Sequence, residues 1–252
     1  MRAQLARTAF WHLARLVGVA LIVTGCAAVS GPSISDPGSL IPSGLAKYLH
    51  LEPSDSEALV ASAAIPAAGA VRYRRLLMQA WQYHFGLAED PAIGFGQVHQ
   101  ESRFDCGAVS PMGSAGCAQF MPATAEWINS LIPAAVRATC PSRSGCPMDP
   151  AWALTALVEY DWRLWGADTW AANSRERWAF SLAAYNGGSA VSTGERAACR
   201  NSPGCNPAHY FDHVERFCGA TGRSPVACRE NRTYPRIILD RWAPAYRAWL
   251  RS

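Results

Sequence analysis

The chain has 252 residues, of which half are hydrophobic and 17% are charged. Its formal net charge is +4, and three of the positive charges belong to arginines in the first 25 residues, so the remainder is nearly neutral. Because basic runs and phosphate-binding Gly-rich loops are also missing from the sequence, we expect no nucleic-acid partner.

The first 25 residues have the features of a secretory signal. They contain three arginines and no acidic residue, followed by an apolar run at 16–23 that is too short to span a bilayer permanently. The run ends in Val-Thr-Gly-Cys at 23–26, which resembles the lipobox of bacterial lipoproteins, where the cysteine is acylated and becomes the mature N-terminus. The resemblance implies lipidation of Cys26 and a periplasmic protein anchored to the outer membrane. An ordinary signal peptide, cut near Cys26, is the alternative.

The other eight cysteines indicate disulfides, because an even number of cysteines is typical of exported domains. They lie in four local pairs along the sequence: Cys106 and Cys117, Cys140 and Cys146, Cys199 and Cys205, and Cys218 and Cys228. Eight cysteines allow 105 connectivities, so the spacing favours these pairs without fixing them. A zinc site is the alternative at Cys205, His209 and His213, which are spaced one helical turn apart. In an exported chain we expect disulfides and no metal.

The composition divides the chain into a leader at 1–25, a tether at 26–69 and one domain at 70–252. The tether is rich in Ser, Pro, Ala and Gly, which is typical of a flexible linker. The domain is large enough to bury its own core.

Apolar residues of this domain recur at helical spacing, and we predict a mainly α fold. One helix is expected around Leu76–Trp81, and another around Trp152–Trp165 that begins at Asp149 and Pro150, a favourable N-cap and first helical residue. Further helices are predicted at 91–102, 122–132, 174–185, 207–217 and 235–250.

The most informative residues surround Glu101. An apolar segment, Ala92–Val98, places Glu101 at a helix end, just before a Gly-rich turn. A carboxyl group in a partly desolvated position keeps its proton to a higher pH and can give it to a leaving oxygen. An isolated Glu-Ser pair is usually structural, so the significance of Glu101 depends on the motifs that follow it.

Five motifs occur in order: Glu101-Ser102, Ser110-Pro111-Met112-Gly113, Gly116-Cys117-Ala118-Gln119 before Phe120-Met121-Pro122, Ala184-Tyr185-Asn186, and Glu230-Asn231-Arg232-Thr233-Tyr234. Their order resembles the soluble lytic transglycosylase (SLT) family of the lysozyme-like superfamily, over essentially 70–252. The resemblance implies a mainly α, lysozyme-like fold and cleavage of peptidoglycan strands, with no cofactor.

Carried over position by position, the resemblance assigns Glu101 as the catalytic acid and base. It assigns Ser110 to orient Glu101 and Gln119 to contact the substrate beside the scissile bond. Tyr185 is implied to place its hydroxyl near Glu101, and Asn186 to shape the same pocket. Glu230 and Tyr234 are implied to close the site from the C-terminal helix. Structural roles are the alternative, for Tyr185 as a core aromatic and for Glu230 and Tyr234 because their motif match is shorter.

The sequence departs from the family at Cys117 and Ala118, which replace Leu and Met. We predict that Cys117 bonds Cys106 and fixes the turn that follows Glu101. Asp105 occupies the place of a common family Asn, and we expect it to cap backbone amides rather than to act as a second catalytic carboxylate.

The resemblance implies that one carboxyl group suffices, whereas ordinary glycosidases use two. Glu101 would protonate the oxygen between N-acetylmuramic acid (MurNAc) and N-acetylglucosamine (GlcNAc), and would then take the proton of the C6 hydroxyl, leaving a 1,6-anhydro ring. The alternatives are a hydrolytic muramidase on the same fold and a noncatalytic wall-binding lipoprotein. The motifs carry no information on oligomeric state or on endolytic against exolytic cleavage.

Ten tryptophans are many for this length, and helical spacing predicts that Trp152, Trp162 and Trp165 belong to the core. Trp127, close to Gln119 in sequence, is the candidate for a sugar-binding surface.

Overall fold

The computed structural model describes residues 66–252. The predicted leader at 1–25, the predicted lipidation site at Cys26 and the predicted tether as far as 65 therefore lie outside the described residues. Helix α3 begins at Ala68, so Ala68 and Gly69, which we assigned to the tether, form its first turn.

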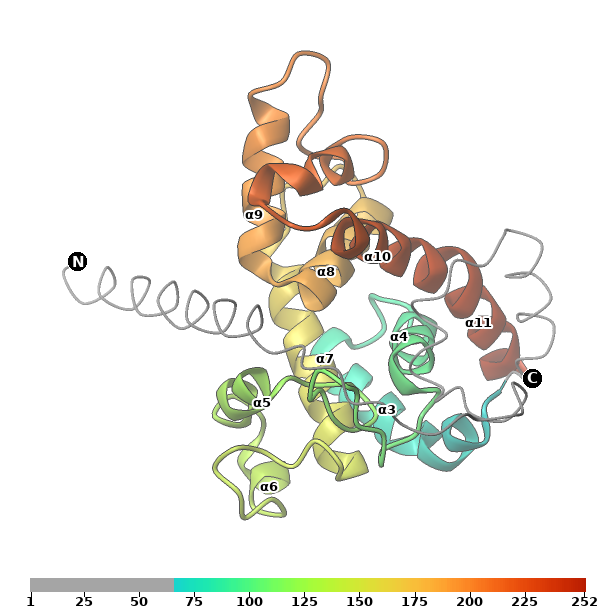
Figure 1. Cartoon of the computed structure of the whole chain (residues 1–252). Helices are drawn as coiled ribbons and strands as arrows, with labels where there is room; N and C mark the ends of the chain where they lie inside the picture. Colours follow the sequence, from blue (N-terminus) through green and yellow to red (C-terminus); the bar gives the residue numbers. More distant parts are fainter. Residues whose placement is uncertain (1–65) are drawn as a thin grey trace, which may run out of the picture. The chain divides into compact units, whose positions relative to one another are not determined.

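The described chain is built of helices joined by loops (Figure 1). In chain order they are α3 (Ala68–Phe85), α4 (Ala92–Ser102), α5 (Pro122–Asn129), α6 (Ala134–Arg137), α7 (Pro150–Ala167), α8 (Ser174–Gly187), α9 (Ser189–Arg200), the 3-10 helix η2 (Val214–Thr221), α10 (Pro225–Ile237), the π-helical turn η3 (Ile238–Trp242) and α11 (Ala243–Arg251). Within 66–252, β pairing is limited to isolated bridges of Ala115 with Val109 and Phe120. The predicted mainly α class is confirmed.

Helix α7 forms the centre of the larger hydrophobic core and packs against α3 and α8. The Asp149 carboxylate accepts a hydrogen bond from Trp152 N at 2.8 Å and Pro150 is the first helical residue, which confirms the predicted start. Trp152 is fully buried, as expected. The expectation for Trp162 was wrong: its side chain is 42% exposed and packs against His84 at the surface.

A smaller core cluster lies between α8, α9 and the loop before η2, and it explains why the helix predicted at 207–217 does not form. The buried Glu176 carboxylate accepts hydrogen bonds from the backbone N–H groups of Tyr210, at 2.7 Å, and Phe211, at 3.2 Å. Asp212 then has a positive φ of 60°. A carboxylate on another helix thus replaces the carbonyl partners that an α-helix would supply, and only Val214–Thr221 is helical, as 3-10.

The C-terminal helices begin earlier than the predicted 235. Ser224 caps α10, its hydroxyl accepting from Ala227 N at 3.2 Å, and Pro225 is the first helical residue. Pro235 lies inside the helix and lacks an N–H, and a π-helical turn follows before α11. Helix α9, which was not predicted, begins after Gly188, whose φ of 87° separates it from α8.

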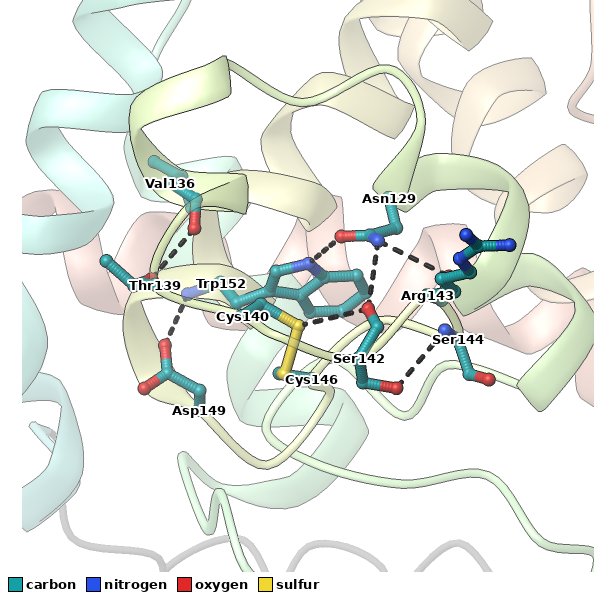
Figure 2. Close-up of a disulfide and its surroundings, with 10 residues drawn as sticks. All are labelled: Asn129, Val136, Thr139, Cys140, Ser142, Arg143, Ser144, Cys146, Asp149 and Trp152. Atoms are coloured by element: carbon teal, nitrogen blue, oxygen red, sulfur yellow. Dashed lines mark hydrogen bonds between the residues drawn. A yellow bond between two sulfur atoms is a disulfide. The ribbon is translucent and has the colours of Figure 1, made fainter.

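Four disulfides close loops between the helices, each within one of the four local pairs. The loop that Cys140 and Cys146 close is also held by Asn129, which donates to Ser142 O at 3.2 Å and accepts from Trp152 Nε1 at 2.7 Å (Figure 2). The loop is thereby fixed to the N-terminal end of α7. No helix from Ala68 onward is both long and apolar enough to cross a membrane.

Candidate active site

Glu101 lies in the last turn of α4, at the end of a buried helix. Residues 92–99 of α4 are all buried, so packing fixes the helix axis that carries Glu101. The helix ends because Arg103 and Phe104 have φ values of 55° and 66°, a left-handed conformation that interrupts the helical hydrogen bonds. The half-buried carboxyl group of Glu101 thus projects from a rigid support, at the position that the sequence predicted.

Tyr234 of α10 reaches this carboxyl group across 133 residues of sequence, and its hydroxyl donates a hydrogen bond to Glu101 Oε1. Burial raises the pKa of Tyr234 well above its ordinary value, and the negative charge of Glu101 raises it further. The phenol therefore keeps its proton and remains a hydrogen-bond donor. One oxygen of the carboxyl group is held in place by this bond.

Tyr185 of α8 forms another wall near Glu101. Its hydroxyl donates to the carbonyl oxygen of Ala118 at 2.8 Å, and its ring packs against Phe120 and Tyr160. Burial, followed by the charge of Glu101, raises the pKa of Tyr185 well above its ordinary value. Trp127, the candidate sugar-binding tryptophan, is half-buried and contacts Tyr160 edge to face, so it extends this line of aromatic rings.

The turn between α4 and α5 is braced from several sides. Cys106 and Cys117 form a disulfide, as predicted. Ser102 Oγ donates to Cys117 O at 2.8 Å, which ties the end of α4 directly to the turn. Gly116 has a φ of 78°, and a Cβ at this position would lie 1.6 Å from Pro147 O, so only glycine fits. The disulfide therefore fixes a turn that packs tightly against the loop before α7.

Ser110 and Gln119 belong to a hydrogen-bond network inside this turn. The Ser114 hydroxyl lies 2.7 Å from Ser110 Oγ and 2.9 Å from Gln119 Oε1. Gln119 Nε2 donates to Gly116 O at 2.8 Å and to Ala108 O at 3.2 Å, so both amide hydrogens are used within the turn. Gln119 thus shapes the turn beside Glu101, and its contact with a substrate stays a prediction.

Asn186 and Glu230 occupy different environments. The side-chain amides of Asn186 and buried Asn231 are 3.0 Å apart, and this contact joins α8 to α10. Glu230 is exposed on α10, one helical turn before Tyr234. The structure therefore brings Tyr234 to the carboxyl group of Glu101 and leaves Glu230 at the surface.

Two buried polar residues of the site, Gln97 and Asp161, were missed by the sequence interpretation. Both side chains are fully buried, and Gln97 Nε2 donates to Asp161 Oδ1 at 3.2 Å. Asp161 is close enough to Glu101 for the two negative charges to repel each other. The signal that could have identified Asp161 is its position as an acidic residue within the predicted apolar helix at 152–165.

The other candidate acid and the candidate zinc ligands make structural interactions. Asp105 Oδ1 accepts from Gly107 N at 2.9 Å, which confirms the expected capping role. Cys205 bonds Cys199, and His213 Nδ1 accepts from Asn206 N at 3.0 Å, which does not fit the zinc alternative. Among residues 66–252, no three His, Cys, Asp or Glu side chains are grouped to hold a metal ion.

Comparisons with known proteins show similarity over part of the chain. Residues 88–198 match the family model described as the transglycosylase SLT domain, a range that includes Glu101, Gln119 and Tyr185. No curated protein matches the chain in sequence. Among solved structures, the chain is similar to the 70 kDa soluble lytic transglycosylase of Escherichia coli, with 22% identity and a TM-score of 0.45, over 71% of this chain and 24% of the other. The match thus spans about a quarter of that protein.

Proposed function

We propose that this protein, whose residues 88–198 match the model of the transglycosylase SLT domain, is an enzyme that cleaves the glycan strands of peptidoglycan as a lytic transglycosylase. The observation that carries the proposal is the setting of Glu101 at the end of a buried helix, with one carboxyl oxygen held by Tyr234. A carboxyl group held in one orientation is suited to give a proton to a bound substrate and to take one back from it.

In the proposed reaction, Glu101 first donates its proton to the oxygen between MurNAc and GlcNAc, and the GlcNAc unit leaves as an alcohol. The 2-acetamido oxygen of MurNAc stabilises the cationic centre at C1. The ionised Glu101 then removes the proton of the C6 hydroxyl, whose oxygen bonds to C1. Glu101 ends the cycle protonated, as it began, and no water is consumed.

The surroundings of Glu101 support a mechanism with a single carboxyl group. A two-carboxylate glycosidase needs a second acid that can reach the sugar or a water molecule. Asp161 is fully buried, and Asp105 is hydrogen-bonded to Gly107 N at the surface. These environments favour a mechanism in which Glu101 acts alone.

Product analysis tests the reaction. Digested sacculi should release fragments whose MurNAc ends are lighter by one water than reducing ends, as mass spectrometry would measure. Full-mass reducing ends alone would instead identify a hydrolytic muramidase. Glu101→Gln should abolish cleavage while wall binding persists, and Asp240→Asn, which alters an exposed ion pair with Arg175, should remain active. Full activity of the Glu101 variant would remove Glu101 from the mechanism.

We further propose that the enzyme is periplasmic and held to the outer membrane by a lipid on Cys26. The basic and apolar leader, the sequence Val-Thr-Gly-Cys at 23–26 and the four disulfides support this location. Cells grown with labelled palmitate should yield labelled protein in the outer-membrane fraction, and Cys26→Ser should lose the label. A wild-type protein that is exported but unlabelled would instead support ordinary signal cleavage.

A further inference from the structure

A buried contact between Asp161 and Gln97 connects the central helix α7 to the helix that carries Glu101. Gln97 lies four residues before Glu101 on α4, so the two side chains share one face of that helix. Neither Asp161 nor Gln97 has any exposed surface, and Gln97 Nε2 lies 3.2 Å from Asp161 Oδ1. This contact therefore fixes the side of α4 from which Glu101 projects.

The remaining oxygen atom of each side chain has no partner. Asp161 Oδ2 and Gln97 Oε1 are both buried without a hydrogen bond. An ionised Asp161 would make both of them unsatisfied acceptors, and each such buried group destabilises the folded state. A proton on Asp161 converts Oδ2 into a donor for Gln97 Oε1. A carboxylic acid and a primary amide can then share two hydrogen bonds.

The charges around Asp161 favour the same protonation state. The titratable groups that interact electrostatically with Asp161 are Glu101 of α4, Tyr185 of α8 and Tyr234 of α10. Tyr160 precedes it on α7. None of these is a cation. Burial, and then repulsion by Glu101, raises the pKa of Asp161 well above its ordinary value, against a smaller opposite effect of Gln97.

We propose that Asp161 carries a proton in the working enzyme and forms a neutral acid–amide pair with Gln97, which makes it a positioning residue for Glu101. The proposal rests on the proposed function for its catalytic consequence. With Asp161 neutral, Glu101 is the only group of this cluster that alternates between a charged and an uncharged state during turnover. The pair holds the helix face that bears Glu101 without placing a second negative charge beside it.

Asp161→Asn tests the proton directly, because a side-chain amide can form the same two hydrogen bonds with Gln97 as a protonated carboxyl group. The variant should keep kcat within about threefold of wild type, with a similar pH profile. Asp161→Leu removes the pair and leaves the Gln97 amide unsatisfied, so kcat should fall by tenfold or more with little change in KM. A similar loss in both variants would show that a charge at 161 is needed, and would overturn the proposal.

Two measurements do not depend on activity. The infrared spectrum at pH 7 should contain a protonated-carboxyl band that disappears in Asp161→Asn. The stability of Asp161→Asn relative to wild type should increase as pH rises, because the protonated Asp161 stabilises the folded wild type progressively less. Asp149→Asn, at the exposed N-cap of the same helix, is the matched control for an acid-to-amide change outside the buried pair. A missing band, or a relative stability that falls with pH, would refute the proton on Asp161.

A double-mutant cycle separates the pair from general packing, even if one single variant folds poorly. Gln97→Leu and Asp161→Leu each leave one buried polar partner, whereas the double variant leaves none and should be more stable than either single variant. Additive losses would show that the residues do not act as a pair. A wild-type protein without wall-cleaving activity would reject the proposed function, while the spectra and stabilities would still decide the protonation of Asp161.

Discussion

Glu195 offers a quantitative test of how burial controls the stability of this domain. The residue lies on α9 with no exposed surface, and neither of its carboxyl oxygens has a hydrogen-bond partner. Burial raises the pKa of Glu195 from 4.5 to about 7, although the positive charges of Arg223 and Arg232 act in the opposite direction. Below pH 4.5 the carboxyl group is protonated in both the folded and the unfolded chain, and its proton has no effect on folding.

Above pH 4.5 the unfolded chain releases this proton more readily than the folded chain does. The free energy of unfolding therefore decreases by up to about 1.4 kcal/mol per pH unit until the pH passes the folded pKa. Since the two pKa values differ by about 2.5 units, wild type should lose about 3 kcal/mol between pH 4 and pH 8 through this group alone. Glu195→Gln should not show this loss.

Urea unfolding of wild type and Glu195→Gln across pH 4–8 measures the effect, because contributions of all other groups cancel in the difference between the two proteins. The relative stability of the variant should increase by about 3 kcal/mol over this range. The exposed Glu126, substituted in the same way, is the matched control for a carboxyl group that is not buried. A flat difference for Glu195→Gln would refute the reasoning from burial.

Three further predictions concern the site and the core. Tyr234→Phe removes the hydrogen bond to Glu101, and kcat for wall cleavage should fall about tenfold to a hundredfold with little change in KM. Replacement of both Cys106 and Cys117 by Ala, which opens a loop of 11-residue separation, should lower the free energy of unfolding by about 2–3 kcal/mol in denaturant titrations. Burial lowers the pKa of His99 from 6.5 to about 4, so this group should reduce the stability of wild type, relative to His99→Asn, by about 3 kcal/mol as pH falls from 7 to 4. Equal acid sensitivity of the two proteins would contradict the last prediction.

Several features were predictable because their causes are local in sequence. Asp149 and Pro150 specify the start of α7 with atoms only a few residues apart. Neighbouring cysteines bond each other because short loops bring them together, as at Cys140 and Cys146. The position of Glu101 at a helix end also followed from the segment around it, an apolar run followed by a Gly-rich turn.

Other features depend on residues that are far apart in the chain. The predicted helix at 207–217 is replaced by a loop because Glu176, more than 30 residues earlier, takes the N–H groups of Tyr210 and Phe211. Helical propensity is weak compared with two hydrogen bonds to a buried carboxylate. The predicted start of the C-terminal helix at 235 was wrong for a different reason. The true start is marked by a local signal, Ser224 followed by Pro225, which the prediction did not use.

The sequence by itself determined the mainly α class and Glu101 as the candidate acid, and it favoured the local disulfide pairs, since each depends on periodicity, spacing or an ordered set of motifs. The tertiary structure decided which contacts Glu101 and its buried neighbours make. Tyr234 meets its carboxyl group from 133 residues away, and Asp161 meets Gln97 from 64 residues away. Burial sets the protonation of such groups, and a residue acquires its burial only when the distant helices pack together.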